Sequence, residues 1–252
     1  MSFYMVLPSN GSRYYPENRA GNYKIRLPYK VRIQPTAYEV ALSELTYICS
    51  IKTLTGLEDD NVIEYDGLEA GYIDLPLTHY SSIKHLLDTI SEQFKKKAVP
   101  LHFYYSDVKS RVSLSVGSGY GLILSEKLSI ILGFNGQVRF NSDVPPLPEI
   151  SIFFYANFRA DLLGGKHHMF IYCNIIDSQI VGSSLVPLLR MINISENAGQ
   201  AVTQTFSSPF YHSTSLTEFD TISILLCDEF GEELPIDKGQ VTLTLHFKKV
   251  SE

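Results

Sequence analysis

The chain has 252 residues, enough for one large β domain or for one domain that carries an insertion. Its hydrophobic fraction of 44% rules against intrinsic disorder, and its net charge of -6 rules against a general nucleic-acid coat, which needs a basic surface. The 16 Tyr and 14 Phe, without any Trp, are typical of sheet surfaces and protein interfaces.

The first part of the chain predicts strands. Residues 3–8 form a short apolar run that ends in a turn. Residues 22–28 alternate between apolar and charged side chains, which is the period of a half-buried strand. Residues 38–51 contain Glu39 and Glu44 and are compatible with a helix, but their β-rich flanks favour a strand.

The middle of the chain predicts two helices. In residues 81–97, apolar side chains recur at helical spacing, Ser81 or Ser82 can cap the start, and Lys95–Lys97 suit the end of the helix dipole. A second, shorter helix is expected at residues 125–132, before Gly133. Three strands are expected beside them, at 72–77, 101–106 and 111–116.

The last part of the chain returns to strands. The clearest one alternates Val241, Leu243, Leu245 and Phe247 against polar neighbours. The other expected strands are at 150–158, 169–176, 185–192, 201–206 and 219–227.

These elements predict a mainly β fold: a single jelly-roll β-sandwich with an inserted small α/β segment. Residues 1–71 and 135–252 are expected to form the sandwich, and residues 72–134 the inserted β-α-β-β-α segment.

Glycine-rich and lysine-rich segments give little support for phosphate binding. Gly117, Gly119 and Gly121 follow a strand, but they match neither the dinucleotide fingerprint nor the P-loop, so we interpret them as a flexible hairpin turn. Lys95–Lys97 are interpreted as a solvated helix end.

Metal and catalytic sites also lack a recognisable pattern. The pairs His79/His85 and His167/His168 have no metal-ligand spacing, and no nucleophile–base pattern can be named. We therefore predict no catalytic residue, no metal and no cofactor.

An acidic cluster surrounds Gly231, and it allows two interpretations. Its carboxylates could bind a cation such as calcium. The simpler interpretation is a solvated hairpin tip in which Gly231 supplies the turn. The cluster consists of Asp228, Glu229, Glu232 and Glu233.

The three cysteines, Cys49, Cys173 and Cys227, are far apart and each lies in an apolar run. They predict buried thiols and synthesis in a reducing compartment. We expect no secretion signal in the first eight residues and no membrane segment, and we treat the sequons at Asn10 and Asn193 as chance.

Five segments, in order along the chain, resemble the penton (minor capsid) proteins of the Polinton/Maverick and adintovirus group. In one of them Tyr38 stands where the family has Trp. The segments are FYMVLPSNGSRYYPENRAGNYKIRLP, YEVALSELTY, LSEKLSIILGF, IIDSQIVGSSLVPLLRMI and EFDTISILLCDEFGEELPIDKGQVTLTLHFKK.

The resemblance implies a non-enzymatic virion protein that self-associates, as a homopentamer, at the five-fold vertices of an icosahedral capsid. Its implied partners are copies of itself and a major capsid protein that forms double jelly-roll trimers, with no direct nucleic-acid site. Two alternatives stay open: a jelly-roll module that binds a receptor or carbohydrate, and a host copy of such a capsid gene with a new role. The interface residues are left open.

Overall fold

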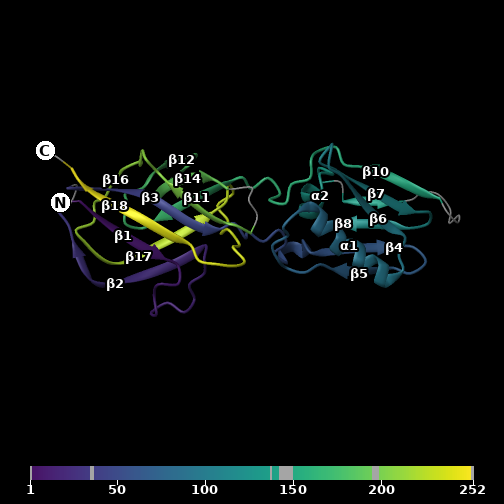
Figure 1. The fold of residues 1–252 in the computed structure, drawn as a ribbon, viewed down its shortest axis with the longest axis horizontal. Coiled ribbons are helices and arrows are strands. Elements are labelled where there is room, and N and C mark those ends of the chain that lie inside the picture. Colours follow the sequence, from purple (N-terminus) through teal and green to yellow (C-terminus); the bar gives the residue numbers. More distant parts are fainter. Residues whose placement is uncertain (1, 35–36, 137, 142–149, 195–198, 251–252) are drawn as a thin grey trace. The chain divides into compact units, whose positions relative to one another are not determined.

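The computed structural model describes residues 2–34, 37–136, 138–141, 150–194 and 199–250. The chain divides into two compact units (Figure 1). Unit 1 combines both chain ends, Met1–Ile51 and Lys166–Glu252, and unit 2 is the middle segment, Lys52–Gly165.

Unit 1 is a sandwich of two antiparallel sheets, in the strand orders β1-β18-β3-β15 and β14-β11-β17-β2, with β16 pairing with β3. Apart from the pairs β11/β14 and β15/β16, strands that follow one another along unit 1 alternate between the two sheets, which is the topology of a jelly roll. The predicted fold class is confirmed. The strands are β1 (Phe3–Pro8), β2 (Asn22–Arg32), β3 (Tyr38–Ile48), β11 (His168–Cys173), β14 (Leu188–Asn193), β15 (Ala201–Thr205), β16 (His212–Ser213), β17 (Glu218–Cys227) and β18 (Thr242–Lys249).

The core of unit 1 lies between these sheets and follows the expected alternation. In β18, Leu243, Leu245 and Phe247 are fully buried, and the Phe247 ring stacks on Phe3 of β1 with centroids 4.6 Å apart. Of residues 38–51, Tyr38–Ile48 form the strand β3, whose buried apolar residues fill this core. The prediction of a strand, and not a helix, at these residues is therefore confirmed.

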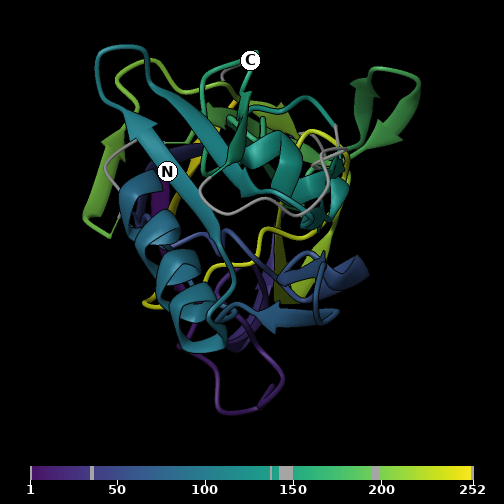
Figure 2. The same ribbon diagram turned by 90° about the vertical axis from the view of Figure 1, so that its right-hand side faces the viewer.

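One expected strand is divided in two. The run at 185–192 breaks at Pro187, which has no N–H to continue a ladder. The residues before it form β13 (Ser184–Val186), which pairs with β12 (Gln179–Val181) in a separate hairpin. Figure 2 shows this hairpin in green, standing clear of the two sheets.

Unit 2 holds the two predicted helices, and both begin and end close to the expected residues. Ser82 Oγ accepts a hydrogen bond from the His85 N–H (3.1 Å), and Ser125 Oγ accepts one from the Leu128 N–H (3.2 Å). Each serine therefore caps the first turn of its helix. The helices are α1 (Ile83–Lys97) and α2 (Glu126–Ile131), with a 3-10 turn, η1 (Leu57–Asp59).

Two further antiparallel sheets complete unit 2, in the orders β10-β7-β6 and β5-β4-β8-β9. The turn that contains Gly119 joins β7 to β8, which lie in different sheets, so the predicted hairpin is wrong although the turn is present. The strands are β4 (Val62–Asp66), β5 (Gly71–Asp74), β6 (Leu101–Ser106), β7 (Arg111–Gly117), β8 (Gly121–Leu124), β9 (Arg139–Asn141) and β10 (Ser151–Tyr155).

The inserted unit is longer at both ends than the predicted residues 72–134. β4 pairs with β5 and β8 inside unit 2, and β10 pairs with β7. The extended segments before residue 72 and after residue 134 thus belong to the insertion rather than to the sandwich. Alternation along a strand indicates a buried face but not the partner strand, so the sequence misplaced these boundaries.

Candidate functional site

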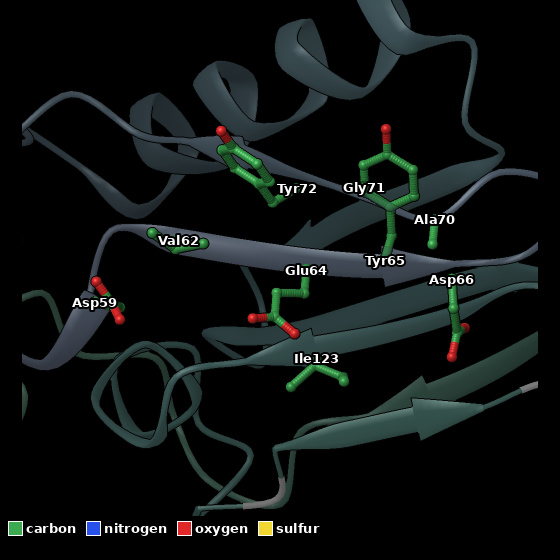
Figure 3. Close-up of a pocket in the computed structure, with 9 residues that line it drawn as sticks. All are labelled: Asp59, Val62, Glu64, Tyr65, Asp66, Ala70, Gly71, Tyr72 and Ile123. Atoms are coloured by element: carbon green, nitrogen blue, oxygen red, sulfur yellow. The ribbon is translucent and has the colours of Figure 1, made fainter.

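A cavity of about 590 Å³ opens on unit 2 beside β4 and β5 (Figure 3). Three carboxylates line it, those of Asp59, Glu64 and Asp66, and Figure 3 shows Asp59 and Asp66 near opposite ends of β4. Its lining contains no His, Cys, Ser or Lys. The cavity therefore lacks a nucleophile with an adjacent base, which an acyl-transfer site needs.

The histidines that the sequence singled out take part in local hydrogen bonds. His85 Nδ1 lies 3.3 Å from Ser81 Oγ, at the start of α1. One carboxylate oxygen of Glu229 lies 2.6 Å from His168 Nδ1 and accepts the backbone N–H groups of His167 and His168. Within the described ranges, no three His, Cys, Asp or Glu side chains are placed to hold a metal ion.

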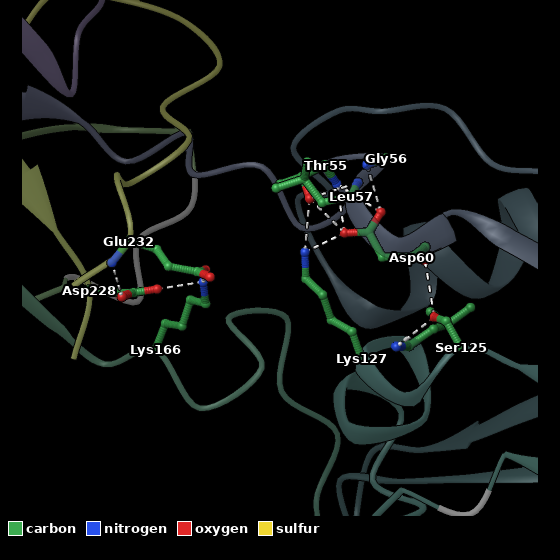
Figure 4. Close-up of polar contacts among 10 residues, drawn as sticks. Thr55, Gly56, Leu57, Asp60, Ser125, Lys127, Lys166, Asp228 and Glu232 are labelled. Atoms are coloured by element: carbon green, nitrogen blue, oxygen red, sulfur yellow. Dashed lines mark hydrogen bonds and ion pairs between the residues drawn. The ribbon is translucent and has the colours of Figure 1, made fainter. Parts of the chain in front are cut away.

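The acidic cluster around Gly231 is only partly the solvated turn that was predicted. Gly231 has φ 83° and supplies the turn, as expected. Asp228, however, is buried, where its carboxylate accepts the N–H groups of Phe230 (2.9 Å) and Glu232 (3.0 Å) and pairs with Lys166 Nζ at 2.5 Å (Figure 4). Burial lowers the pKa of Lys166, but the two carboxylates of Asp228 and Glu232 outweigh it and the pKa is raised. The ammonium group of Lys166 thus occupies the position beside Asp228 and Glu232 that a bound calcium ion would take.

A second buried carboxylate, Asp60, holds the loop at residues 55–56, near the beginning of unit 2. It pairs with Lys127 and accepts N–H groups from Thr55 (2.9 Å) and Gly56 (2.7 Å), as Figure 4 shows. Burial raises the pKa of Asp60, but these partners outweigh it and the pKa lies below its ordinary value. This pair could not be predicted from a local sequence pattern, because Lys127 lies 67 residues further along the chain.

The three cysteines are buried free thiols, which confirms the prediction of burial. Burial raises the pKa of Cys173 to about 12. Burial, together with the nearby carboxylates of Asp228 and Glu233, raises the pKa of Cys227 to about 11. Burial also raises the pKa of Cys49. Because a raised pKa keeps these thiols protonated, they are poor nucleophiles. Their role is to pack in the core.

The remaining predicted features have no ligand-binding geometry. Lys95–Lys97 are exposed at the end of α1, as expected of a solvated helix terminus. After the glycine-rich turn, β8 separates Gly119 from α2, so the turn does not open onto a helix N-terminus.

Unit 1 has an exposed apolar surface, which is a better candidate for a binding site than the cavity on unit 2. Val6 of β1 and Tyr29 of β2 are exposed and line a groove of about 430 Å³ between these two strands. Ile180 and Leu185 are exposed on the β12–β13 hairpin. None of these residues was predicted from the sequence to lie in an interface. A usable signal was present in β1, where residues 3–8 are apolar on both faces instead of alternating.

Unit 2 has an exposed aromatic surface of its own. The rings of Tyr104, Phe153 and Tyr155 lie in a row on the outer face of the sheet β10-β7-β6. Successive ring centroids are 6.3 and 6.4 Å apart, with interplanar angles of 30° and 20°. Ser113 and Ser115 of the central strand lie between the aromatic strands. The row forms a flat aromatic surface with hydroxyl groups beside it.

No family model matches the sequence, and no curated protein matches it. Among solved structures, the chain is similar to the mavirus penton protein, with 10% sequence identity and a TM-score of 0.51 over 99% of this chain and 100% of that one. A chain of the Sputnik virophage is similar at 10% identity and a TM-score of 0.49, covering 98% of each chain.

In the parts of the chain that the structure describes, none of the helices has the length and apolarity needed to cross a membrane. The resemblance drawn from the sequence is confirmed for the fold: the chain shares the fold of the mavirus penton protein over 99% of its length.

Proposed function

We propose that the chain is a structural capsid subunit, which assembles with copies of itself into a closed ring at the five-fold vertices of an icosahedral shell. The observation that carries the proposal is the shared fold with the mavirus penton protein over 99% of this chain. A jelly roll supplies a rigid wedge with two lateral edges, and a repeated contact between such edges closes a ring when the rotation fits.

The surface chemistry of unit 1 supports this role. Exposed apolar side chains lie along β1 and on the β12–β13 hairpin. On a domain that stays monomeric, polar side chains at these positions would favour solubility. The proposed partners are further copies of the chain and the double jelly-roll major capsid protein of the facets. The proposed location is the virion, after synthesis in a reducing compartment of the host cell, which suits the three free thiols.

The test is the mass of the purified chain, measured by light scattering after size exclusion over a concentration series. A species five times the 28.4 kDa of one chain supports the vertex subunit. A trimer at all concentrations, or a chain that stays monomeric up to the highest one, contradicts the ring.

A second candidate, binding of a receptor carbohydrate, is favoured by one observation. The row of Tyr104, Phe153 and Tyr155 presents exposed flat rings, two of which carry a phenol hydroxyl, and this suits the apolar face and the hydroxyl groups of a sugar. Glycan-array binding that is lost in Phe153→Ala and Tyr155→Ala, with unchanged melting temperature, would support it. Absence of binding to any glycan would reject it.

A further inference from the structure

The β12–β13 hairpin is an arm whose exposed side is apolar. Ile180 and Leu185 are cross-strand partners and are 82% and 69% exposed. The ten residues 178–187 contain no charged side chain. An exposed, uncharged aliphatic pair is typical of the desolvated centre of an interface rather than of a free surface.

The base of the arm is held firmly in unit 1. Gln179 donates a side-chain hydrogen bond to the carbonyl of Leu188, and His212 Nε2 lies 2.8 Å from the carbonyl oxygen of Leu189. The backbone N–H of Asp177 donates to the carbonyl of Ser213 (2.9 Å). Because both ends of the hairpin are fixed, its aliphatic pair is presented in one direction, and binding costs little ordering entropy.

The groove between β1 and β2 has the complementary character. Both strands are at the end of their sheets in the described topology, so each has a ladder partner on one side. Leu7 and Ile25 close the floor of the groove, where the Tyr23 hydroxyl donates to the Leu7 carbonyl (3.0 Å), and exposed Val6 and Tyr29 stand along it. Arg26 is the one charged residue that lines this groove, and the other lining residues offer apolar contacts to an apolar occupant.

The arm and the groove lie at opposite edges of one sheet of unit 1. The arm leads directly into β14, one edge strand of the sheet β14-β11-β17-β2, and the groove is bounded by β2, the opposite edge strand of that sheet. A protruding apolar element and an apolar groove thus occupy opposite edges of one rigid unit. This is the arrangement of a head-to-tail contact, in which each copy gives one surface and receives the other.

We propose that the β12–β13 arm of one copy seats Ile180 and Leu185 in the β1–β2 groove of the next copy. The occupant of the groove is therefore a second copy of this chain, and repetition of the contact closes the ring. The inference rests on the proposed function and names the interface through which it works. The arm and the β1 side of the groove lie in segments that carry the sequence resemblance, 175–192 and 3–28.

The first experiment blocks each surface separately and measures self-association by light scattering. The arm variant is Ile180→Asp/Leu185→Asp and the groove variant is Val6→Asp/Tyr29→Asp; all four side chains are exposed, so the fold is kept. Each variant should weaken self-association at least about a hundredfold, because each loses two apolar anchors worth about tenfold apiece. The matched control is Leu68→Asp/Val108→Asp, which changes two equally exposed aliphatic residues of unit 2 and should leave the ring intact.

The second experiment mixes the two blocked variants. The groove variant keeps an intact arm and the arm variant an intact groove, so one productive contact remains per pair. A head-to-tail interface then gives a 1:1 dimer that cannot extend, whereas either variant alone stays monomeric. A symmetric contact that uses one surface twice would not be restored by mixing.

The outcomes separate this inference from the proposed function. If the parent chain forms a ring and both blocked variants form the same ring, the arm–groove contact is wrong while the capsid role stands. If mixing restores no dimer, the head-to-tail pairing of these two surfaces is wrong. If the parent chain never self-associates, the proposed function fails and this inference fails with it.

Discussion

At the residue scale, buried polar side chains hold the loops of both units. Asp60 accepts backbone N–H groups of the loop before η1, and Asp228 accepts those of the turn at Gly231. Each is paired with a lysine, Lys127 or Lys166. A buried carboxylate that serves several donors stabilises one loop conformation, because every alternative leaves a charge without partners.

Asp60→Asn should therefore destabilise unit 2 by about 2 kcal/mol. The amide keeps the size of the side chain, but it loses the charge beside Lys127 and one oxygen that accepts N–H groups. Because the chain has no Trp, urea unfolding is followed by Tyr fluorescence and circular dichroism, which give the change in the free energy of unfolding. The neighbouring substitution Asp59→Asn is the control: Asp59 is exposed and tolerates the same exchange at its φ of 54°. Equal stability of both variants would contradict the role assigned to Asp60.

The buried thiol of Cys173 predicts a loss of stability at alkaline pH. Its pKa is raised to about 12 in the folded chain, against about 8.5 in the unfolded chain. Stability is thus fully present below pH about 8.5 and falls as the pH rises toward the folded pKa, by about 1.4 kcal/mol per pH unit. Comparison of unfolding free energies at pH 8 and pH 10 should show a shallower slope for Cys173→Ala than for the parent chain. An identical slope would contradict the assignment.

At the element scale, helix caps and turns were the most predictable parts of the molecule. Ser82 and Gly133 stand at the ends that the sequence assigned to them, because capping is a local property of a few residues. Strand identity in β3 and β18 was also predictable from alternation. The β12–β13 hairpin was missed, because its apolar residues continue into β14, although Gly182 in its turn and Pro187 at its end were local signs of the break.

Gly133→Ala should destabilise unit 2 more than the same change at another left-handed glycine. Gly133 has φ 86°, and an added Cβ would lie 2.5 Å from the backbone oxygen of Phe158. Gly165 has φ 89° but no heavy atom within 4 Å of that position. Thermal unfolding should therefore give a loss of about 1 kcal/mol for Gly165→Ala and clearly more for Gly133→Ala. Equal losses would mean that the close approach to Phe158 costs nothing.

At the scale of the whole molecule, a jelly roll made from both chain ends carries an insertion between β3 and β11. The two-part organisation was predictable from the helical signal in the middle of the chain, but the boundaries were not. β4 and β10 look like strands of the sandwich until their partners are known, and strand partners far apart in sequence leave no local pattern. The assembly surfaces share this difficulty, since exposure depends on the complete fold.

Replacement of residues 52–165 by a flexible Gly/Ser linker should leave unit 1 folded. All strands of its two sheets lie outside the insertion, and the core between the two sheets is complete without it. The shortened chain should unfold in one cooperative transition and keep the self-association of the parent, because arm and groove both lie in unit 1. A shortened chain that folds but remains monomeric, beside a parent that assembles, would assign the contact to unit 2 instead.

The central claim is that this chain closes a ring of identical subunits. The most direct measurement is the rotational symmetry of the purified particles in electron-microscopy class averages. We expect five-fold rings that disappear in the Ile180→Asp/Leu185→Asp variant and persist in Leu68→Asp/Val108→Asp. Three-fold particles, two-fold dimers or open filaments from the parent chain would contradict it.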